Sequence, residues 1–234
     1  GRNAGATITF DALEIKSPEG CTRLAGPHVE IAAGERVQVT GDPGAGKTLF
    51  FRAIAGLWPW GSGRIGLPAD GVPALVPGTP YFPPGTLREV FGQTAGDDRL
   101  DDAEIRDVLG EVGLGRLSAA LDRQARWDHE LNGDEQRLLM LAATALGHPK
   151  WIVIDDALDT FDTDTLKRVL ALFRKRLGDA AILNIGRTLT EDGFFSRTLT
   201  IVKDKAAPAL KPARVRPGAI EAPARSGRKV VKAG

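Results

Sequence analysis

The stretch "TGDPGAGKT", residues 40–48, lies between an alternating apolar run, "RVQVT" (36–40), and an apolar segment, "LFFRAIAGL" (49–57). It fits the pattern G-x-x-x-x-G-K-[ST], in which a glycine-rich loop joins a strand to a helix. Glycines let the backbone curl so that successive N–H groups point at one anion, and the start of the helix adds the positive end of its dipole. The stretch therefore predicts a strand, a phosphate-binding loop and a helix. The alternative is a glycine-rich turn that binds nothing.

Two side chains of this loop add chemistry of their own. Lys47 would reach the β- and γ-phosphates of a nucleotide, and the hydroxyl of Thr48 would be a ligand of Mg²⁺. The predicted nucleotide contacts are Gly41, Asp42, Pro43, Gly44, Ala45, Gly46, Lys47, Thr48 and Leu49.

A second motif, "WIVIDD" (151–156), is an apolar run that ends in two carboxylates. Ligands of open α/β sheets bind at the carboxyl ends of the strands, which is where this pattern places Asp155 and Asp156. We expect Asp155 to hold Mg²⁺ through water and Asp156 to be the base, or the group that orients the attacking water. The alternative for Asp155 is an ordinary cap of a helix or turn.

The order of periodic segments indicates an α/β fold. Strands are expected at 7–16, on both sides of the turn Ala33-Gly34, and at 72–76, 150–159 and 180–186, and helices at 101–114, 132–147 and 164–177. Alternating strands and helices favour a mostly parallel sheet, and residues 85–147 form a helical insertion between its strands.

The composition sets limits on the class of protein. A chain of 234 residues with 42% hydrophobic residues suits one domain, or one domain with a subdomain. No apolar run approaches the ~20 residues that a membrane helix needs. The single cysteine, Cys21, excludes an internal disulfide and fits a reducing compartment. The chain opens with Gly1 and shows no signal-peptide pattern, so we expect a segment of a longer protein.

The charge is distributed unevenly. From Lys203 onward the chain has nine Lys or Arg and two Asp or Glu, a net charge of +7, whereas the preceding residues carry −6. Residues 203–234 are rich in Pro, Ala and Gly, and we expect a disordered basic tail. Such a tail can lie on an anionic membrane or on nucleic acid, but a solvated tail explains it equally well. We expect no nucleic-acid partner.

The order of these motifs resembles the nucleotide-binding domain of an ABC transporter. More narrowly, it resembles the cassettes of the peroxisomal acyl-CoA half-transporters and of bacterial relatives whose permease is fused ahead of the cassette. The resemblance covers about residues 5–202. It rests on "GERVQVTGDPGAGKTLFFRAIAGLWPWGSGRI" (34–65), "PYFPPGTLREV" (80–90), "VGLGRL" (112–117), "WDHELNGDEQR" (127–137) and "HPKWIVIDDALDTFD" (148–162).

The resemblance implies a RecA-like P-loop core with a mostly parallel sheet, a small antiparallel β portion and a helical subdomain at about 85–147, all within a nucleotide-binding domain of residues 1–202. Family members form head-to-tail dimers with two composite ATP sites, each pairing one cassette's phosphate loop with the other's signature loop. The implied cofactors are ATP and Mg²⁺, and Asn132 and Gly133 would contact the nucleotide bound to the partner subunit.

The resemblance also implies the surroundings of the domain. A transmembrane permease domain would be fused N-terminally in the full-length protein, and its coupling helix would dock on the surface around residues 77–88. The domain would then lie on the cytoplasmic face of a membrane, the bacterial inner membrane being the expected one.

Two departures from the family concern loops around the γ-phosphate. Gly78 stands where the family has a glutamine that contacts Mg²⁺ and the attacking water. In the signature "LNGDEQ" (131–136), Asn132 replaces serine and keeps a donor for phosphate, while Asp134 replaces the second glycine. At ~4 Å and an effective dielectric constant near 20, a carboxylate and a phosphate charge repel by roughly 4 kcal/mol. The alternative for Asp134 is a favourable charge at a helix N-terminus in a cassette that never closes on ATP.

Three further departures concern catalysis and the base. Asp156 replaces the catalytic glutamate and withdraws the carboxylate by roughly 1 Å, and misplacements of that size can cost ~10²-fold in rate. Arg187 replaces the switch histidine; it can still clamp a γ-phosphate, although a surface arginine is the alternative. The family's adenine-stacking aromatic would fall near Lys16-Ser17, and neither side chain can stack.

The sequence therefore leaves two functions open. The first is an ATP-binding cassette that powers transport across a membrane with a degenerate catalytic site, in which Asp156 and Arg187 act in catalysis and Thr48 and Asp155 hold the metal. The second is a nucleotide-binding regulatory or dimerisation module with little or no ATPase activity. A soluble nucleotide kinase is disfavoured because the chain lacks a lid-like arginine cluster and carries a signature-like segment.

Overall fold

The computed structural model describes residues 7–96, 100–187 and 193–204, so the predicted tail lies outside the described residues from position 205 onward. The strands are β1 (Thr7–Ser17), β2 (Gly20–Leu24), β3 (His28–Ala32), β4 (Arg36–Thr40), β5 (Gly61–Gly66), β6 (Ala74–Val76), β7 (Trp151–Asp155), β8 (Ala181–Ile185) and β9 (Arg197–Asp204). The helices are α1 (Lys47–Ile54), α2 (Leu87–Ala95), α3 (Asp102–Glu111), the 3₁₀ helix η1 (Gly115–Ala120), α4 (Trp127–Glu130), α5 (Gly133–Leu146) and α6 (Thr163–Arg176).

The strands form one curled sheet with a parallel and an antiparallel part. Their order is β3-β1-β2-β9-β4-β8-β7-β6. β2 and β3 pair with different parts of one edge of β1, and β5 pairs with its opposite edge. β4, β6, β7 and β8 run parallel, whereas β1, β2, β3 and β5 pair antiparallel. β9 joins the two parts, because residues 197–200 pair parallel with β4 and residues 201–204 pair antiparallel with β2. The predicted α/β fold with a mostly parallel core sheet is confirmed.

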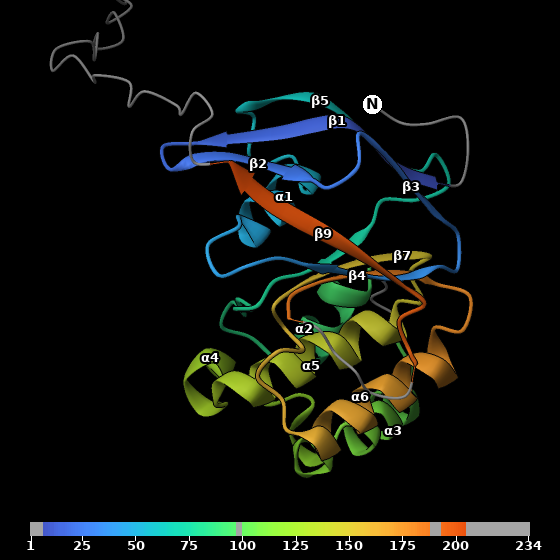
Figure 1. Ribbon diagram of the computed structural model, residues 1–234. Coiled ribbons are helices and arrows are strands. Elements are labelled where there is room, and N and C mark those ends of the chain that lie inside the picture. The colour runs from blue at the N-terminus through green and yellow to red at the C-terminus, as the bar shows by residue number, and fades with distance from the viewer. Residues whose placement is uncertain (1–6, 97–99, 188–192, 205–234) are drawn as a thin grey trace, which may run out of the picture.

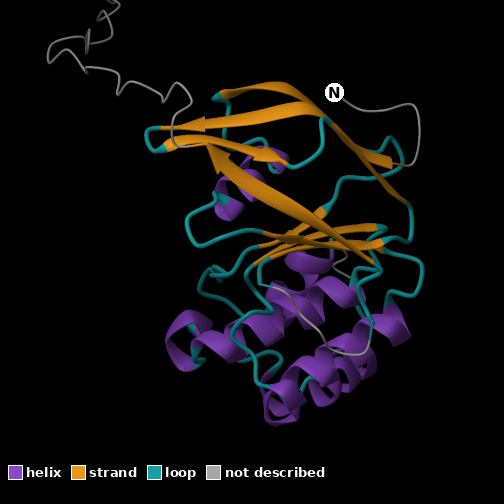
Figure 2. Cartoon of the chain, viewed as in Figure 1, coloured by secondary structure: helices purple, strands orange, loops and turns teal. Residues whose placement is uncertain are grey.

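The elements stack in layers (Figure 1). Helix α1 lies between the antiparallel strands and the parallel sheet, and the remaining helices cover the opposite face of the parallel sheet. Figure 2 shows this separation as a strand-rich half and a helix-rich half of the molecule. Two apolar cores correspond to the layers: one includes Phe10 and Phe50, whose ring centroids are 5.1 Å apart, and the other includes Trp127, Leu139 and Phe173.

Residues 85–147 contain α2, α3, η1, α4 and α5. Thr86 and Glu89 form a capping box that begins α2, and Asn132 and Glu135 form another that begins α5. The Trp127 indole is buried and donates to the carbonyl of Gly85 over 2.9 Å, so the start of this helical segment is tied to the start of α4.

Several strands were not predicted from the sequence. β5, "GSGRIG", has no alternating apolar pattern. Its glycines are required because the backbone of β5 lies very close to the backbone of β1. A Cβ at Gly61 or Gly63 would come within 2.1 or 2.3 Å of a backbone oxygen of β1. β2 and β9 were missed as well, and the predicted strands at 72–76 and 150–159 are shorter, Ala74–Val76 and Trp151–Asp155.

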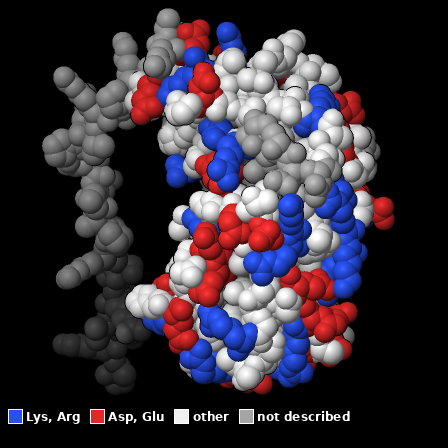
Figure 3. Space-filling view, turned by 60° about the horizontal axis from the view of Figure 1, so that its bottom comes forward, with Lys and Arg blue, Asp and Glu red and all other residues white. Residues whose placement is uncertain are grey.

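Charged side chains of both signs are interspersed on the helical face, which Figure 3 brings forward. Many of them pair across helices, as Arg88 does with Asp102 and Asp122, and Arg176 with Glu111. The exposed pairs, such as Arg88 with Asp122, contribute little stability, with a median of about 0–1 kcal/mol. Among the described residues, no helix is long and apolar enough to span a bilayer.

Candidate nucleotide-binding and hydrolytic site

The loop between β4 and α1 has the backbone conformation of a phosphate cradle. Gly44 and Gly46 adopt φ angles of +78° and +97°, which side-chain-bearing residues rarely adopt. A Cβ at Gly46 would lie 2.2 Å from the hydroxyl of Thr22, and that hydroxyl donates to the carbonyl of Ala45 over 2.9 Å. A Cβ at Gly41 would lie 2.8 Å from the carbonyl of Ile201. The loop is therefore supported from behind by β2 and β9, its shape requires glycine, and its amides lie at the start of α1.

A cavity of about 540 Å³ opens in front of this loop, and we call it the phosphate-loop cavity. Its volume suits a nucleotide-sized ligand. It is lined by Ser17, Pro18, Glu19, Pro43, Gly44, Ala45, Gly46, Lys47, Thr48, Leu49, Trp58, Asp156 and Lys203. The predicted contacts from Pro43 to Leu49 are thus brought together around one hollow, whereas Gly41 and Asp42 line a neighbouring hollow beside β9.

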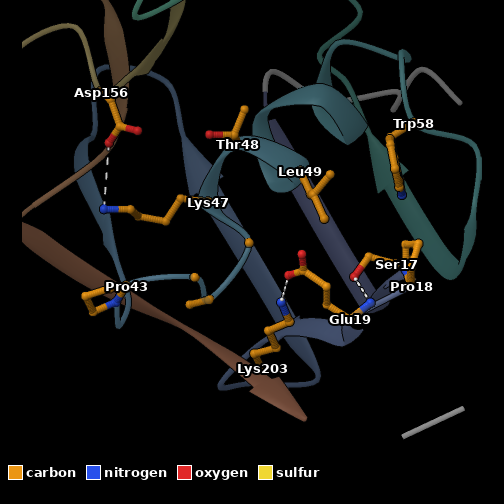
Figure 4. Close-up of a pocket in the computed structure, with 13 residues that line it drawn as sticks. Ser17, Pro18, Glu19, Pro43, Lys47, Thr48, Leu49, Trp58, Asp156 and Lys203 are labelled. Atoms are coloured by element: carbon orange, nitrogen blue, oxygen red, sulfur yellow. Dashed lines mark hydrogen bonds and ion pairs between the residues drawn. The ribbon is translucent and has the colours of Figure 1, made fainter. Parts of the chain in front are cut away.

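The two ends of the phosphate-loop cavity differ in chemistry (Figure 4). At one end, Lys47 extends toward Asp156, with 3.7 Å between Nζ and Oδ1. At the other end lie Pro18 and Trp58. The Trp58 indole donates to the carbonyl of Lys16 over 3.0 Å, so this ring is held beside Lys16-Ser17, neither of which has an aromatic side chain.

A salt bridge crosses the same region. Lys203 at the end of β9 lies 2.7 Å from Glu19, and Lys203 lowers the pKa of this carboxyl. Sequence reasoning missed Trp58, Glu19 and Lys203 as cavity residues. Only the tryptophans of "WPW" (58–60) offered a signal, because they are large aromatic side chains in a Gly/Pro-rich loop.

A second cavity, also about 540 Å³, adjoins the first at Thr48 and Asp156, and we call it the carboxylate cavity. Its walls are Thr48, Phe51, Arg52, Leu57, Pro77, Gly78, Thr79, Arg137, Asp155, Asp156, Asp159 and Thr160. It collects three acids from the end of β7 and the loop that follows, together with two arginines. The predicted metal residues Thr48 and Asp155 therefore face the same space.

Asp155 has the properties of a cation ligand. Its side chain is 6% exposed, and within the described part of the chain its buried Oδ1 has no hydrogen-bond partner. Burial, and then the neighbouring charge of Asp156, raise the pKa of Asp155 to about 6. A divalent cation would supply both the missing partner and the opposite charge, so this residue and Thr48 fit Mg²⁺.

The number of protein ligands also suits Mg²⁺. No cluster of three or more His, Cys, Asp or Glu that could hold a metal occurs among the residues that the structure describes. Mg²⁺ is commonly bound by one or two protein oxygens, with phosphate oxygens and waters completing the octahedron. The arrangement of Thr48 and Asp155 beside the phosphate loop matches that pattern rather than an all-protein cage.

Asp156 and Asp159 continue the acidic wall. Asp156 adopts a left-handed backbone, φ +52°, and its N–H donates to the carbonyl of Ile185 over 2.8 Å. This conformation is costly for a residue with a side chain and is held by the bond to β8. Asp159 accepts the backbone N–H of Arg187 over 2.7 Å, and burial raises the pKa of Asp159. The carbonyl of Arg187 in turn accepts from Gln38 over 2.7 Å.

The structure fixes the backbone of Arg187 but does not place its side chain in either cavity. The residue is exposed, and neither cavity includes it among its lining residues. Its position beside Asp159 keeps it close to the acidic wall. A role in catalysis for Arg187 stays a prediction.

The signature segment begins helix α5. The side-chain oxygen of Asn132 accepts the N–H groups of Asp134 and Glu135, each over 3.0 Å, so Asn132 caps the helix. Asn132 and Gly133 line neither cavity. Asp134 is not a free carboxylate: its Oδ1 accepts from Thr160 over 2.8 Å and from Arg137 over 3.0 Å. The guanidinium of Arg137 offsets the charge of Asp134, whose repulsion toward a γ-phosphate was one of the two interpretations that the sequence left open.

A nucleotide-sized cavity, a glycine-shaped phosphate cradle and an acidic strand end together define a P-loop nucleotide-binding protein. A family model described as ABC transporter matches residues 24–159, more than half of the chain. The chain belongs to the ABC transporter family, within which it is an ATP-binding domain.

Known proteins of this family show the same likeness. The chain is 30% identical, over 184 residues, to the inner membrane ABC transporter ATP-binding protein YddA of Escherichia coli (strain K12), covering 79% of this chain and 32% of that protein. It is 27% identical, over 179 residues, to ATP-binding cassette sub-family D member 3 of Homo sapiens, covering 72% of this chain and 27% of that protein. The chain thus spans about a third of the length of the curated relatives that it matches.

A solved structure of a bacterial Atm1-family ABC exporter with ATP bound has the same fold, with a TM-score of 0.68 and 23% sequence identity. The likeness covers 88% of this chain and 38% of that one. The predicted resemblance to ABC cassettes, including relatives of the D sub-family, is confirmed.

Proposed function

We propose that this chain is an ATP-binding cassette that binds MgATP tightly and hydrolyses it slowly, and that it powers transport of a substrate across a membrane. The observation that carries the proposal is the junction of the two cavities, where Lys47, Thr48, Asp155 and Asp156 meet. Binding chemistry and hydrolytic chemistry share one wall there. The cradle is intact, while the hydrolytic side chains are altered.

The binding half assigns roles to named groups. The backbone from Gly41 to Thr48 and the ammonium of Lys47 would hold the phosphates, since they combine oriented amides with a point charge. The base would extend toward Pro18 and Trp58, at the end of the phosphate-loop cavity opposite Asp156. The indole face of Trp58 offers a stacking surface that Lys16 and Ser17 cannot supply.

The hydrolytic half would use Asp155, Asp156 and Thr48. Asp155 and Thr48 would hold Mg²⁺, which neutralises charge on the phosphates when bound. Asp156 would orient the attacking water and accept its proton. Asp156 pairs with Lys47, so phosphates that draw Lys47 away would release the carboxylate of Asp156 for that role. Arg187 would clamp the γ-phosphate from beside Asp159.

The partners follow from the family. A second cassette would pack head to tail and present its Asn132 and Gly133 to this chain's phosphates. A transmembrane permease domain, fused ahead of the cassette in the full-length protein, would dock on residues 77–88, where Tyr81 is 74% exposed. The domain would then lie on the cytoplasmic face of a membrane, and we infer a bacterial inner membrane.

A regulatory or dimerisation module is the second candidate, because Gly78, Asp134 and Asp156 all depart from the family's hydrolytic residues. Calorimetric titration with MgATP and a phosphate-release assay on the same dimeric preparation separate the two. A slow ATPase binds MgATP tightly, and its rate of phosphate release rises in proportion to the protein concentration. A module binds equally tightly and releases none, and a chain that does not bind MgATP contradicts both.

A further inference from the structure

Arg137 occupies a position that the proposed roles leave unexplained. It lies in helix α5, four residues after the helix begins, and its side chain is only 20% exposed. It lines the carboxylate cavity opposite Asp155, Asp156 and Asp159. This arginine is thus largely covered and shares a cavity with three acids.

The guanidinium of Arg137 joins two loops to the start of α5. Its Nε donates to the carbonyl of Gly78 over 2.7 Å, in the loop that follows β6. Its Nη1 donates to Asp134 over 3.0 Å, and the same carboxylate oxygen accepts the hydroxyl of Thr160 over 2.8 Å, in the loop that follows β7. The loop after β6 is therefore bonded to Arg137 itself, and the loop after β7 is bonded to its partner Asp134.

Gly78 explains why this link starts from the helix. A Cβ at position 78 would lie 2.8 Å from the carbonyl of Asp155, so the loop passes directly against the end of β7. No side chain can leave this backbone without displacing the strand end that carries the acids. Arg137 instead bonds to the backbone of this loop, at the carbonyl of Gly78.

The charges of the carboxylate cavity support the same role. Its acids are Asp155, Asp156 and Asp159, and its cations are Arg52 and Arg137, with Lys47 3.7 Å from Asp156. Arg137 is the arginine among these that also bonds to the backbone of a cavity loop. Its side chain therefore fixes geometry and contributes charge at the same place.

We propose that Arg137 is a positioning residue for hydrolysis, which ties the Gly78 loop to the start of α5 and, through Asp134, to Thr160 in the loop that follows the acidic end of β7. The proposal rests on the proposed ATPase function. Arg137 does not touch the phosphates in this account. Its loss would leave MgATP binding intact and would misplace the water-orienting wall.

The experiment compares Arg137→Ala with Arg137→Lys and with the matched control Arg116→Ala. Arg116 pairs with Glu135 of the same helix at 2.6 Å but reaches neither loop. We expect Arg137→Ala to lower kcat at least tenfold, with KM and the calorimetric Kd for MgATP within threefold of wild type. Arg137→Lys, which keeps the charge and loses the fork, should recover part of kcat. Arg116→Ala should match wild type.

A second readout does not depend on turnover. Hydrogen–deuterium exchange of peptides covering 77–80 and 157–162 should be faster in Arg137→Ala than in wild type and unchanged in Arg116→Ala. Asp134→Asn, which keeps the acceptor for Thr160 and Arg137, should exchange like wild type.

Each outcome has a meaning. Wild-type kcat and wild-type exchange in Arg137→Ala would overturn the positioning role, and so would a loss of MgATP binding, because the residue would then act on the nucleotide itself. If wild type binds no MgATP, the proposed function fails, while the exchange comparison still decides whether Arg137 holds the two loops.

Discussion

The phosphate-loop cavity and the carboxylate cavity share a wall but are built in different ways. The first is shaped by backbone: glycines in left-handed conformations, helix-start amides and support from Thr22 behind the loop. The second is shaped mostly by side chains, which come from α1, the loop 77–79, the start of α5, and the end of β7 with the loop after it. A backbone-built site keeps its chemistry when its neighbours change, whereas a side-chain-built site changes with each substitution.

The largest expected effect is on the phosphate-loop cavity. Lys47→Ala should weaken MgATP binding at least 100-fold, because it removes the point charge that neutralises the β- and γ-phosphates. Lys203→Ala is the matched control, since Lys203 lines the same cavity but pairs with Glu19. We expect that control to change the calorimetric Kd by less than threefold. Equal affinities in wild type and Lys47→Ala would refute the phosphate-loop assignment.

The next effect concerns the buried acid of the carboxylate cavity. Because the pKa of Asp155 is raised to about 6, ionising it costs the folded state free energy that the unfolded chain does not lose. The nucleotide-free protein should lose stability as pH rises from about 4 to about 6. Asp155→Asn should remove this loss, worth up to about 3 kcal/mol, and should also remove stabilisation by Mg²⁺ with ATP.

Thermal melts of wild type and Asp155→Asn between pH 4 and 7.5 measure this effect. The difference in melting temperature should be small near pH 4, where both side chains are neutral, and should grow toward pH 7. A wild type that is the more stable of the two at pH 7 without Mg²⁺ would contradict the burial argument.

A moderate effect is expected at Gly78. Restoring the family's glutamine by Gly78→Gln should destabilise the fold by about 1–3 kcal/mol and should not raise turnover, because its Cβ would lie 2.8 Å from the carbonyl of Asp155. Gly110→Gln is the control, as a Cβ there meets nothing within 4 Å. Denaturant melts of both variants suffice, and a Gly78→Gln protein with raised turnover and unchanged stability would show that the loop adapts.

The smallest effect is expected at the base end of the phosphate-loop cavity. Trp58→Ala should weaken ATP binding about fivefold, because one aromatic–base stack is worth about 1–3 kcal/mol and we expect the lower end of that range. The bond from the indole to the carbonyl of Lys16 holds the ring in place for such a stack. Trp58→Phe keeps a ring and should bind within twofold of wild type. If both variants bind like wild type in calorimetry, the base does not reach this tryptophan.

The difference between the cavities also explains what the sequence could predict. The residues 41–48 are contiguous and their chemistry is local, so the motif was enough to predict the loop, the strand before it and the helix after it. The apolar run before Asp155 likewise predicted a buried strand that ends in acids. The phosphate loop and the acidic strand end were both predictable because each is encoded by neighbouring residues in the sequence.

Long-range contacts were not predictable in this way. The environment of Asp134 depends partly on Thr160, which is 26 residues away in the chain and is brought near only by folding, so the sequence left repulsion and a favourable helix-start charge as alternatives where the structure shows two donors. Trp58 lies in a loop rich in Gly and Pro, and that composition does not predict where the side chain points. β5 was missed because its glycines serve close contact with β1 rather than an apolar pattern.

The central claim is that binding is intact and hydrolysis is limited by the carboxylate at 156. The most direct measurement is phosphate release at saturating MgATP from wild type and from Asp156→Glu, with Kd determined on the same samples. We expect equal Kd values, and turnover raised about 10- to 100-fold in Asp156→Glu, because the longer side chain returns the carboxylate by roughly 1 Å. Turnover that is unchanged or lower in Asp156→Glu, at equal Kd, would contradict the central claim.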